Sequence, residues 1–166
     1  LYAMRAVKEL GLPVKKNVRL ILGTDEECGS SDIKYYYSQE KEAPMTFSPD
    51  AAYPLVNTEK GRFPGHFTAK FACSDALPKL VSIQAGTKVN VVPGKAKAVV
   101  EGFTADVLET AAAETETETG IRFDFAVEGA VTTVTATGIG AHASTPEVGN
   151  NALTGLLVFL GKLAFA

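Results

Sequence analysis

The sequence is short of several features, and each shortage excludes a class of protein. Its only two cysteines, Cys28 and Cys73, lie far apart and form no CxxC pair, and nothing resembles a signal peptide. A reducing compartment, the cytoplasm, is therefore expected. No apolar run reaches the roughly 18 residues that a membrane span needs, so we expect a soluble protein without a membrane partner. The net charge of −3 combines 16 basic and 19 acidic residues without a basic stripe, so nucleic acid is not an expected partner.

The first 60 residues alternate between helical and strand patterns. Spacing of apolar residues predicts a helix over 1–10, and a run rich in branched residues predicts a buried strand over 17–22. A second helix is expected from Ser30 or Ser31 to about residue 39, followed by a short strand over 45–47. This order is typical of a parallel α/β sheet, whose ligands gather where the carboxyl ends of the strands open. Residues 1–60 are therefore interpreted as part of an α/β domain of this kind.

The pattern changes near residue 60, where alternating, glycine-punctuated segments begin, and a domain boundary is predicted there. The order of strands and helices predicts an α+β domain over 61–166 with one antiparallel sheet and helices on one face, of ferredoxin-like type. Helical patterns run into both chain ends, so we expect an internal fragment of a larger protein, truncated at its C-terminus. The expected elements are strands over 65–72, 80–85, 96–103, 123–127 and 131–138 and helices over 106–118 and 150–166.

Three consecutive acids, Asp25, Glu26 and Glu27, follow the first predicted strand, and Asp50 follows the second. Parallel strands would bring these carboxylates to the same edge of a sheet, where clustered carboxylates favour a divalent cation. Glu27 and Asp50 could then bind the metal while Glu26 takes a proton from a metal-bound water. The alternative is that the triplet caps the following helix, whose macrodipole favours negative charge.

Two further positions are candidates for a reaction role. His142 follows Gly138 and Gly140 in a predicted turn between a strand and a helix, whose start is expected around Ser144 with capping-box spacing. Such a histidine is accessible and well held, although a lone turn histidine can also be purely structural. Asn90 lies in a valine-rich segment, at a predicted strand end where its amide can face a ligand.

Four motifs, in this order, resemble the dinuclear zinc metallopeptidases, in particular the carnosinase-like (Xaa-His) bacterial dipeptidases. The resemblance covers nearly the whole chain, and it implies that residues 1–60 are part of the catalytic domain and that residues 61–166 form a lid or dimerisation-like domain. The motifs are Thr-Asp-Glu-Glu-Cys-Gly-Ser-Ser-Asp, Phe-Ser-Pro-Asp-Ala-Ala-Tyr-Pro, Asn-Val-Val-Pro and Ala-His-Ala-Ser-Thr-Pro-Glu-x-Gly-x-Asn-Ala.

The resemblance implies a role for each candidate residue. Glu26 corresponds to the general base, and Glu27 and Asp50 correspond to metal ligands. His142 corresponds to a histidine of the lid domain that stabilises the oxyanion, and Asn90 to a lid contact with the bound dipeptide substrate. The full-length enzyme is expected to hold two zinc ions, with manganese or cobalt as alternative metals.

The chain departs from the family pattern in its metal ligands. It has only two histidines, His66 and His142, and neither belongs to a His-x-Asp motif. Because zinc needs three or four protein ligands, Glu27 and Asp50 alone are expected to hold metal weakly or not at all, and the fragment to be inactive by itself. Two alternatives stay open. The chain could be a non-catalytic binding or dimerisation module that self-associates through an edge strand or helix face, or an amidohydrolase of the same fold acting on acylated amino acids.

Overall fold

The structure is a computed structural model of the whole chain, and it describes residues 1–166 except 51, 62 and 71–73. Two compact units make up the chain, Leu1–Ala51 and Ala52–Ala166. Cys28 is exposed in the first unit, and Cys73 lies outside the described residues. No helix among the described residues is long and apolar enough to span a membrane. The predicted domain boundary near residue 60 stays a prediction.

The first unit contains the two helices that the sequence predicts. Helix α1 covers Tyr2–Glu9 and carries an ion pair between Arg5 and Glu9, with Nε and Oε1 2.7 Å apart. Helix α2 covers Ser31–Gln39, and a short 3-10 turn, η1, covers Glu26–Cys28 just before it. The acidic triplet therefore lies directly at the entrance to α2.

The two strands predicted for the first unit are wrong. Residues 17–22 and 45–47 are irregular, and Val18, Leu22 and Met45 are exposed. A parallel strand depends on hydrogen bonds from at least one neighbouring strand, and the described part of this unit contains no strand at all. An apolar run without such neighbours stays irregular, so the parallel sheet is absent from the described residues.

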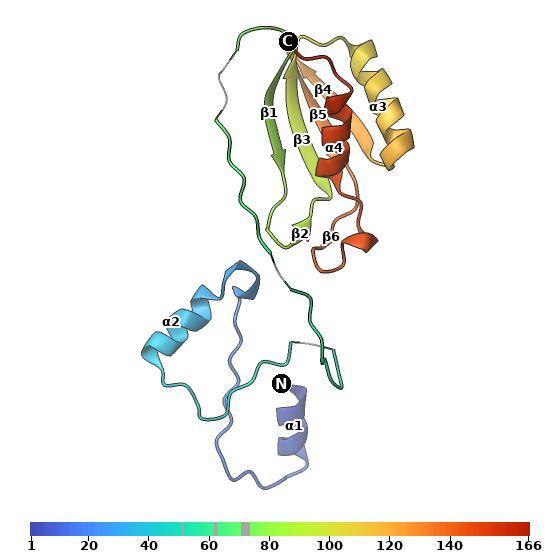
Figure 1. Cartoon of the computed structure of the whole chain (residues 1–166). Helices are drawn as coiled ribbons and strands as arrows, with labels where there is room; N and C mark the ends of the chain where they lie inside the picture. Colours follow the sequence, from blue (N-terminus) through green and yellow to red (C-terminus); the bar gives the residue numbers. More distant parts are fainter. Residues whose placement is uncertain (51, 62, 71–73) are drawn as a thin grey trace. The chain divides into compact units, whose positions relative to one another are not determined.

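The second unit is built on a four-stranded antiparallel sheet in the order β1-β3-β5-β4. A separate pair of two-residue strands, β2 and β6, lies at one end of this sheet (Figure 1). Residues 65–70 of the strand predicted over 65–72 are irregular, and residues 71 and 72 lie outside the described ranges. The strands are β1 Lys79–Ala85, β2 Val91–Val92, β3 Lys95–Glu101, β4 Arg122–Glu128, β5 Val131–Thr137 and β6 Ala141–His142.

Two helices cover one face of the four-stranded sheet (Figure 1). Helix α3 covers Ala105–Thr119 and packs on β4, while α4 covers Ala152–Gly161 and packs on β3, β5 and α3. This arrangement confirms the prediction of an α+β domain with an antiparallel sheet. The strands of the main sheet and the two helices follow one another as strand, strand, helix, strand, strand, helix, and the ferredoxin-like comparison stays a prediction.

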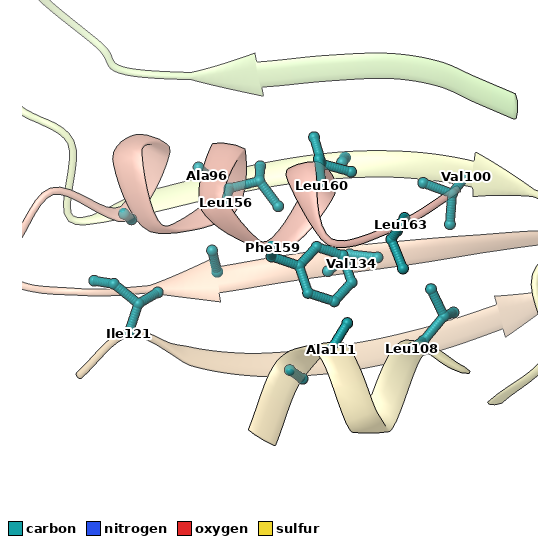
Figure 2. Close-up of a cluster of buried hydrophobic side chains, with 14 residues drawn as sticks. Ala96, Val100, Leu108, Ala111, Ile121, Val134, Leu156, Phe159, Leu160 and Leu163 are labelled. Atoms are coloured by element: carbon teal, nitrogen blue, oxygen red, sulfur yellow. The ribbon is translucent and has the colours of Figure 1, made fainter. Parts of the chain in front are cut away.

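The core lies between this sheet and the two helices. Phe159 of α4 is completely buried near its centre, as Figure 2 shows, with Val134 of β5 and Ala111 of α3 around it. Its ring stacks on Phe123 of β4 with centroids 4.9 Å apart. Burial of a large apolar side chain of this kind stabilises the fold by about 1.5–3 kcal/mol. This core stabilises the sheet and the two helices to which the β2–β6 pair is joined.

We expect Gly155→Ala to destabilise the second unit. A Cβ at Gly155 would lie 2.4 Å from Cγ1 of the fully buried Ile121, so α4 would have to move away from the sheet. Overpacking of this kind costs about 1–3 kcal/mol of unfolding free energy, measurable by urea denaturation. Gly161→Ala in the same helix is the matched control, since a Cβ there meets nothing within 4 Å. Equal stability of the two variants would contradict the close packing of α4 on Ile121.

Candidate functional site

The loop before α2 is organised by two aspartates that bond across it. The carboxylate of Asp25 accepts hydrogen bonds from the backbone N–H of Ser31, at 2.8 Å, and from the Ser31 hydroxyl. In return, Oδ2 of Asp32 accepts the backbone N–H groups of Thr24, at 2.5 Å, and of Asp25, at 3.2 Å. Asp25 therefore satisfies an otherwise unpaired N–H at the start of the helix.

The three acids of the triplet differ in their contacts and in their exposure. Asp25 is half-buried and caps α2, as one interpretation of the sequence predicted for the triplet. Glu26 and Glu27 lie in the η1 turn and are exposed. Hydrogen bonds to the carboxylates of Asp25 and Asp32 thus hold the loop that carries the exposed side chains of Glu26 and Glu27.

The pKa of Asp32 is lowered, first because its carboxylate accepts the backbone N–H of Thr24 and then because it accepts those of Ile33 and Asp25. Hydrogen bonds to the charged form favour that form. A carboxyl group with a lowered folded pKa contributes stability above its unfolded pKa, and this contribution disappears as the pH falls through the folded value. The loop is therefore expected to loosen in acid.

We expect Asp32→Ala to loosen the loop that carries Glu26 and Glu27. The N–H groups of Thr24 and Asp25 would lose their shared acceptor, and amide hydrogen exchange at these positions should accelerate about tenfold at neutral pH. The ratio of exchange rates between variant and wild type should fall towards one as the pH drops through the folded pKa of Asp32. Asp106→Ala, in the first turn of α3, is the control. A rate ratio that stays at one throughout would contradict this account of the loop.

The predicted metal ligands Glu27 and Asp50 belong to no metal site that the described residues form by themselves. Glu27 lies in η1, whereas Asp50 is exposed in an irregular segment, where its backbone N–H donates to the carbonyl of Ser48 at 3.1 Å. Across the described ranges, no group of three or more His, Cys, Asp and Glu side chains is placed to hold a metal ion. Zinc sites need three or four protein ligands, so the described residues do not by themselves fit the metal that the resemblance implies.

The second unit brings together two predicted site residues that are 52 positions apart in the sequence. The Asn90 amide nitrogen lies 3.5 Å from Nε2 of the exposed His142. Pairing of β2 with β6 aligns Val91 with His142, and the backbone N–H of Ala143 donates to the carbonyl of Asn90 at 2.8 Å. Backbone hydrogen bonds therefore hold both side chains on the same small structure.

Close backbone packing allows the β2–β6 pair to form beside the main sheet. A Cβ at Gly94 would lie 2.8 Å from the backbone nitrogen of Gly140, a separation that only glycine permits. The backbone N–H of Gly138 donates to the carbonyl of Gly94 at 2.9 Å. The glycines near His142 therefore allow two chain segments to pack closely, in addition to making the backbone flexible.

Helix α4 begins close to residue 150, where the apolar pattern predicts it, and later than the capping box at Ser144 predicts. Residues Pro146–Val148 form a 3-10 turn, and α4 starts at Ala152 with Asn151 as its cap, which accepts the N–H groups of Leu153 and Thr154. The predicted capping box at Ser144 is wrong, because the serine hydroxyl lies 2.7 Å from Nδ1 of His142 instead. The imidazole competes for a side chain that would otherwise cap a helix.

Two residues contact the candidate site residues in ways that the sequence did not predict: Asp32, and Ser144, for which only a helix start was predicted. A signal existed for each. Asp32 occupies the first turn of a predicted helix, where an acid can also turn back to the preceding loop. Ser144 follows His142 by two residues, the spacing at which a serine can reach a neighbouring side chain.

Comparison with known proteins supports a relationship to dipeptidases. No family model matches the chain. It is 35% identical over 161 residues to the protein named "Putative dipeptidase YtjP" of Bacillus subtilis, covering 96% of this chain and 35% of that protein. It is also 34% identical over 165 residues to the Beta-Ala-Xaa dipeptidase of Lactobacillus delbrueckii subsp. lactis, covering 99% and 35% of the two chains. The chain therefore spans about a third of the length of the curated relatives it matches, and the similarity supports a place among the dipeptidases.

Proposed function

We propose that this chain is part of a zinc-dependent dipeptidase and supplies part of its catalytic domain together with its lid domain. The similarity to dipeptidases over nearly the whole chain supports hydrolysis of dipeptides. The observation that carries the proposal is the juxtaposition of Asn90 and His142, two residues that the motifs identify independently and that β2 and β6 place 3.5 Å apart.

His142 is proposed to stabilise the negative charge that develops on the carbonyl oxygen of the scissile peptide bond. An imidazole N–H placed at that oxygen stabilises the transition state more than the ground state, which raises kcat. Asn90 is proposed to contact the bound dipeptide, since its amide offers both donors and an acceptor beside His142. Both side chains are held by backbone pairing, so little ordering is needed when substrate binds.

Glu26 is proposed as the general base. It accepts a proton from the attacking water and returns it to the leaving amine, and its exposure in η1 leaves its carboxylate accessible to substrate. The bonds of Asp25 and Asp32 support this role because they fix the loop on both sides of the turn. This is the organisation expected of a catalytic side chain held by neighbours that do not themselves react.

Glu27 and Asp50 are proposed as metal ligands that this chain contributes to a longer protein, with zinc, manganese or cobalt as the metal. A bound divalent cation would supply Lewis-acid chemistry at the scissile carbonyl. Because the described residues do not form such a site by themselves, the remaining ligands must come from other segments. The 166-residue chain alone is accordingly proposed to be inactive.

A second candidate function is a binding or dimerisation module. The sheet edge formed by β1 favours it, because Leu80, Val81 and Ile83 on this strand are 40–51% exposed. Exposed edge strands with apolar side chains tend to pair with other strands. This function and hydrolysis by a longer protein are separate properties and can be tested separately.

The test compares hydrolysis of a β-alanyl dipeptide by the 166-residue chain with hydrolysis by a protein extended at both ends to the length of the relatives. We expect turnover only by the extended protein in the presence of zinc. Turnover by the chain alone would contradict the proposed need for further ligands. Absence of turnover by the metal-loaded extended protein, together with concentration-dependent dimerisation of the chain, would favour the binding module.

A further inference from the structure

Ser144 makes two contacts with the same ring nitrogen of His142. Its hydroxyl oxygen lies 2.7 Å from Nδ1, and its backbone N–H donates to Nδ1 at 3.2 Å. The sequence pattern predicts a helix start at Ser144, and the proposed function gives this residue no role. Its contacts nevertheless place it directly against the proposed oxyanion-stabilising residue.

These contacts specify which nitrogen of the neutral imidazole carries the proton. One ring nitrogen of a neutral histidine is a donor and the other an acceptor. The backbone N–H of Ser144 can only donate, and its contact at 3.2 Å favours Nδ1 as the acceptor and Nε2 as the nitrogen that carries the hydrogen. The amide nitrogen of Asn90 can also only donate, but its separation of 3.5 Å from Nε2 is long for a hydrogen bond, so the two shorter contacts of Ser144 decide the tautomer. The hydroxyl group rotates freely and can donate to Nδ1 as well, at the shorter distance of 2.7 Å.

Two further hydrogen bonds hold the backbone around Ser144. The backbone N–H of Thr145 donates to the carbonyl of His142 at 3.0 Å, which closes the turn around Ser144. Lys60 donates a hydrogen bond to the carbonyl oxygen of Ser144 from outside the turn. The serine is thus held by the backbone on one side and by a lysine on the other.

The resulting tautomer suits an oxygen that carries negative charge. With Nδ1 as acceptor, the N–H at Nε2 faces the same region as the amide nitrogen of Asn90, 3.5 Å away. Two N–H groups that converge in this way can both donate to one oxyanion. The opposite tautomer would present a lone pair at Nε2 and repel that oxygen.

We propose that Ser144 is a positioning residue whose hydroxyl holds His142 in the Nε2–H tautomer, with this N–H turned towards the substrate. The role of this tautomer in catalysis rests on the proposed function of His142. The presence of the tautomer in the protein does not depend on that function. The two can therefore be tested apart.

The test is long-range ¹H–¹⁵N NMR of the histidine rings in the 166-residue chain at a pH of about 9, where an ordinary imidazole is neutral. The chain contains only two histidines, so His66→Gln assigns both sets of signals. We expect His142 to show a larger fraction of the Nε2–H form than the exposed His66. Ser144→Ala should reduce that excess at least twofold, and Ser144→Thr, which keeps a hydroxyl group, should retain it.

Backbone amide spectra that match the wild type outside the loop would show that each variant is folded. An Nδ1–H form at His142, or a tautomer ratio that Ser144→Ala leaves unchanged, would overturn the proposal. The same substitution in the extended protein separates the inference from the proposed function. A tautomer shift without any loss of dipeptide hydrolysis would uphold the positioning role of Ser144 and contradict the proposed role of His142.

Discussion

Glu26→Gln in the extended, metal-loaded protein is expected to lower kcat for dipeptide hydrolysis by about 10²–10⁴-fold. Glutamine preserves the size of the side chain but cannot accept the proton of the attacking water. Because Glu26 is exposed in η1 and caps no helix, the substitution should leave the fold intact. Steady-state kinetics with a β-alanyl dipeptide measure the effect.

Glu42→Gln is the matched control for this experiment. Glu42 is also an exposed glutamate in the first unit, and none of the four motifs contains it. Its substitution should change kcat less than twofold. If Glu26→Gln behaves like Glu42→Gln, the general base is another residue and the assignment of the acidic triplet fails.

His142→Ala is expected to lower kcat by about 10²–10³-fold, the effect of removing one oxyanion donor. The side chain is exposed on β6, so its loss removes no part of the buried core. The effect should appear mainly in kcat, since a group that acts on developing charge contributes little to ground-state binding.

Asn90→Ala is expected to raise KM more than it lowers kcat, because Asn90 is proposed to contact the bound substrate.

His66→Ala serves as the control for the loss of a histidine. His66 is exposed in an irregular segment, where the sequence predicted a strand. A drop in kcat of the same size for both histidine variants would indicate a general effect on folding. An unchanged kcat for His142→Ala alone would contradict the proposed oxyanion role of His142.

The four helices and the four strands of the main sheet could be predicted from the sequence because their signals are local, whereas the short strands β2 and β6 were not predicted and the strand expected over 65–72 is irregular at residues 65–70. Strands β4 and β5 are joined by only two residues, Gly129 and Ala130, and their partners are therefore sequence neighbours. Helix α3 begins and ends within one residue of the predicted range. Short-range patterns were sufficient wherever both partners lie close together in the chain.

The strands predicted for the first unit failed because a parallel strand depends on distant partners. An apolar run such as 17–22 shows the composition of a buried strand but does not show which segments would pair with it. The placement of Asn90 beside His142 was not predicted for the same reason, since the pairing of β2 with β6 joins residues 52 positions apart. The motifs predicted the candidate side chains, and only the structure shows that two of them, Asn90 and His142, lie close together.

The measurement that tests the account most directly is a calorimetric zinc titration of the 166-residue chain and of the extended protein. We predict tight binding of about two zinc ions by the extended protein, weakened by Glu27→Gln or Asp50→Asn, and no tight binding by the chain alone. An extended protein that hydrolyses the dipeptide without taking up metal, or whose zinc affinity both substitutions leave unchanged, would contradict the account.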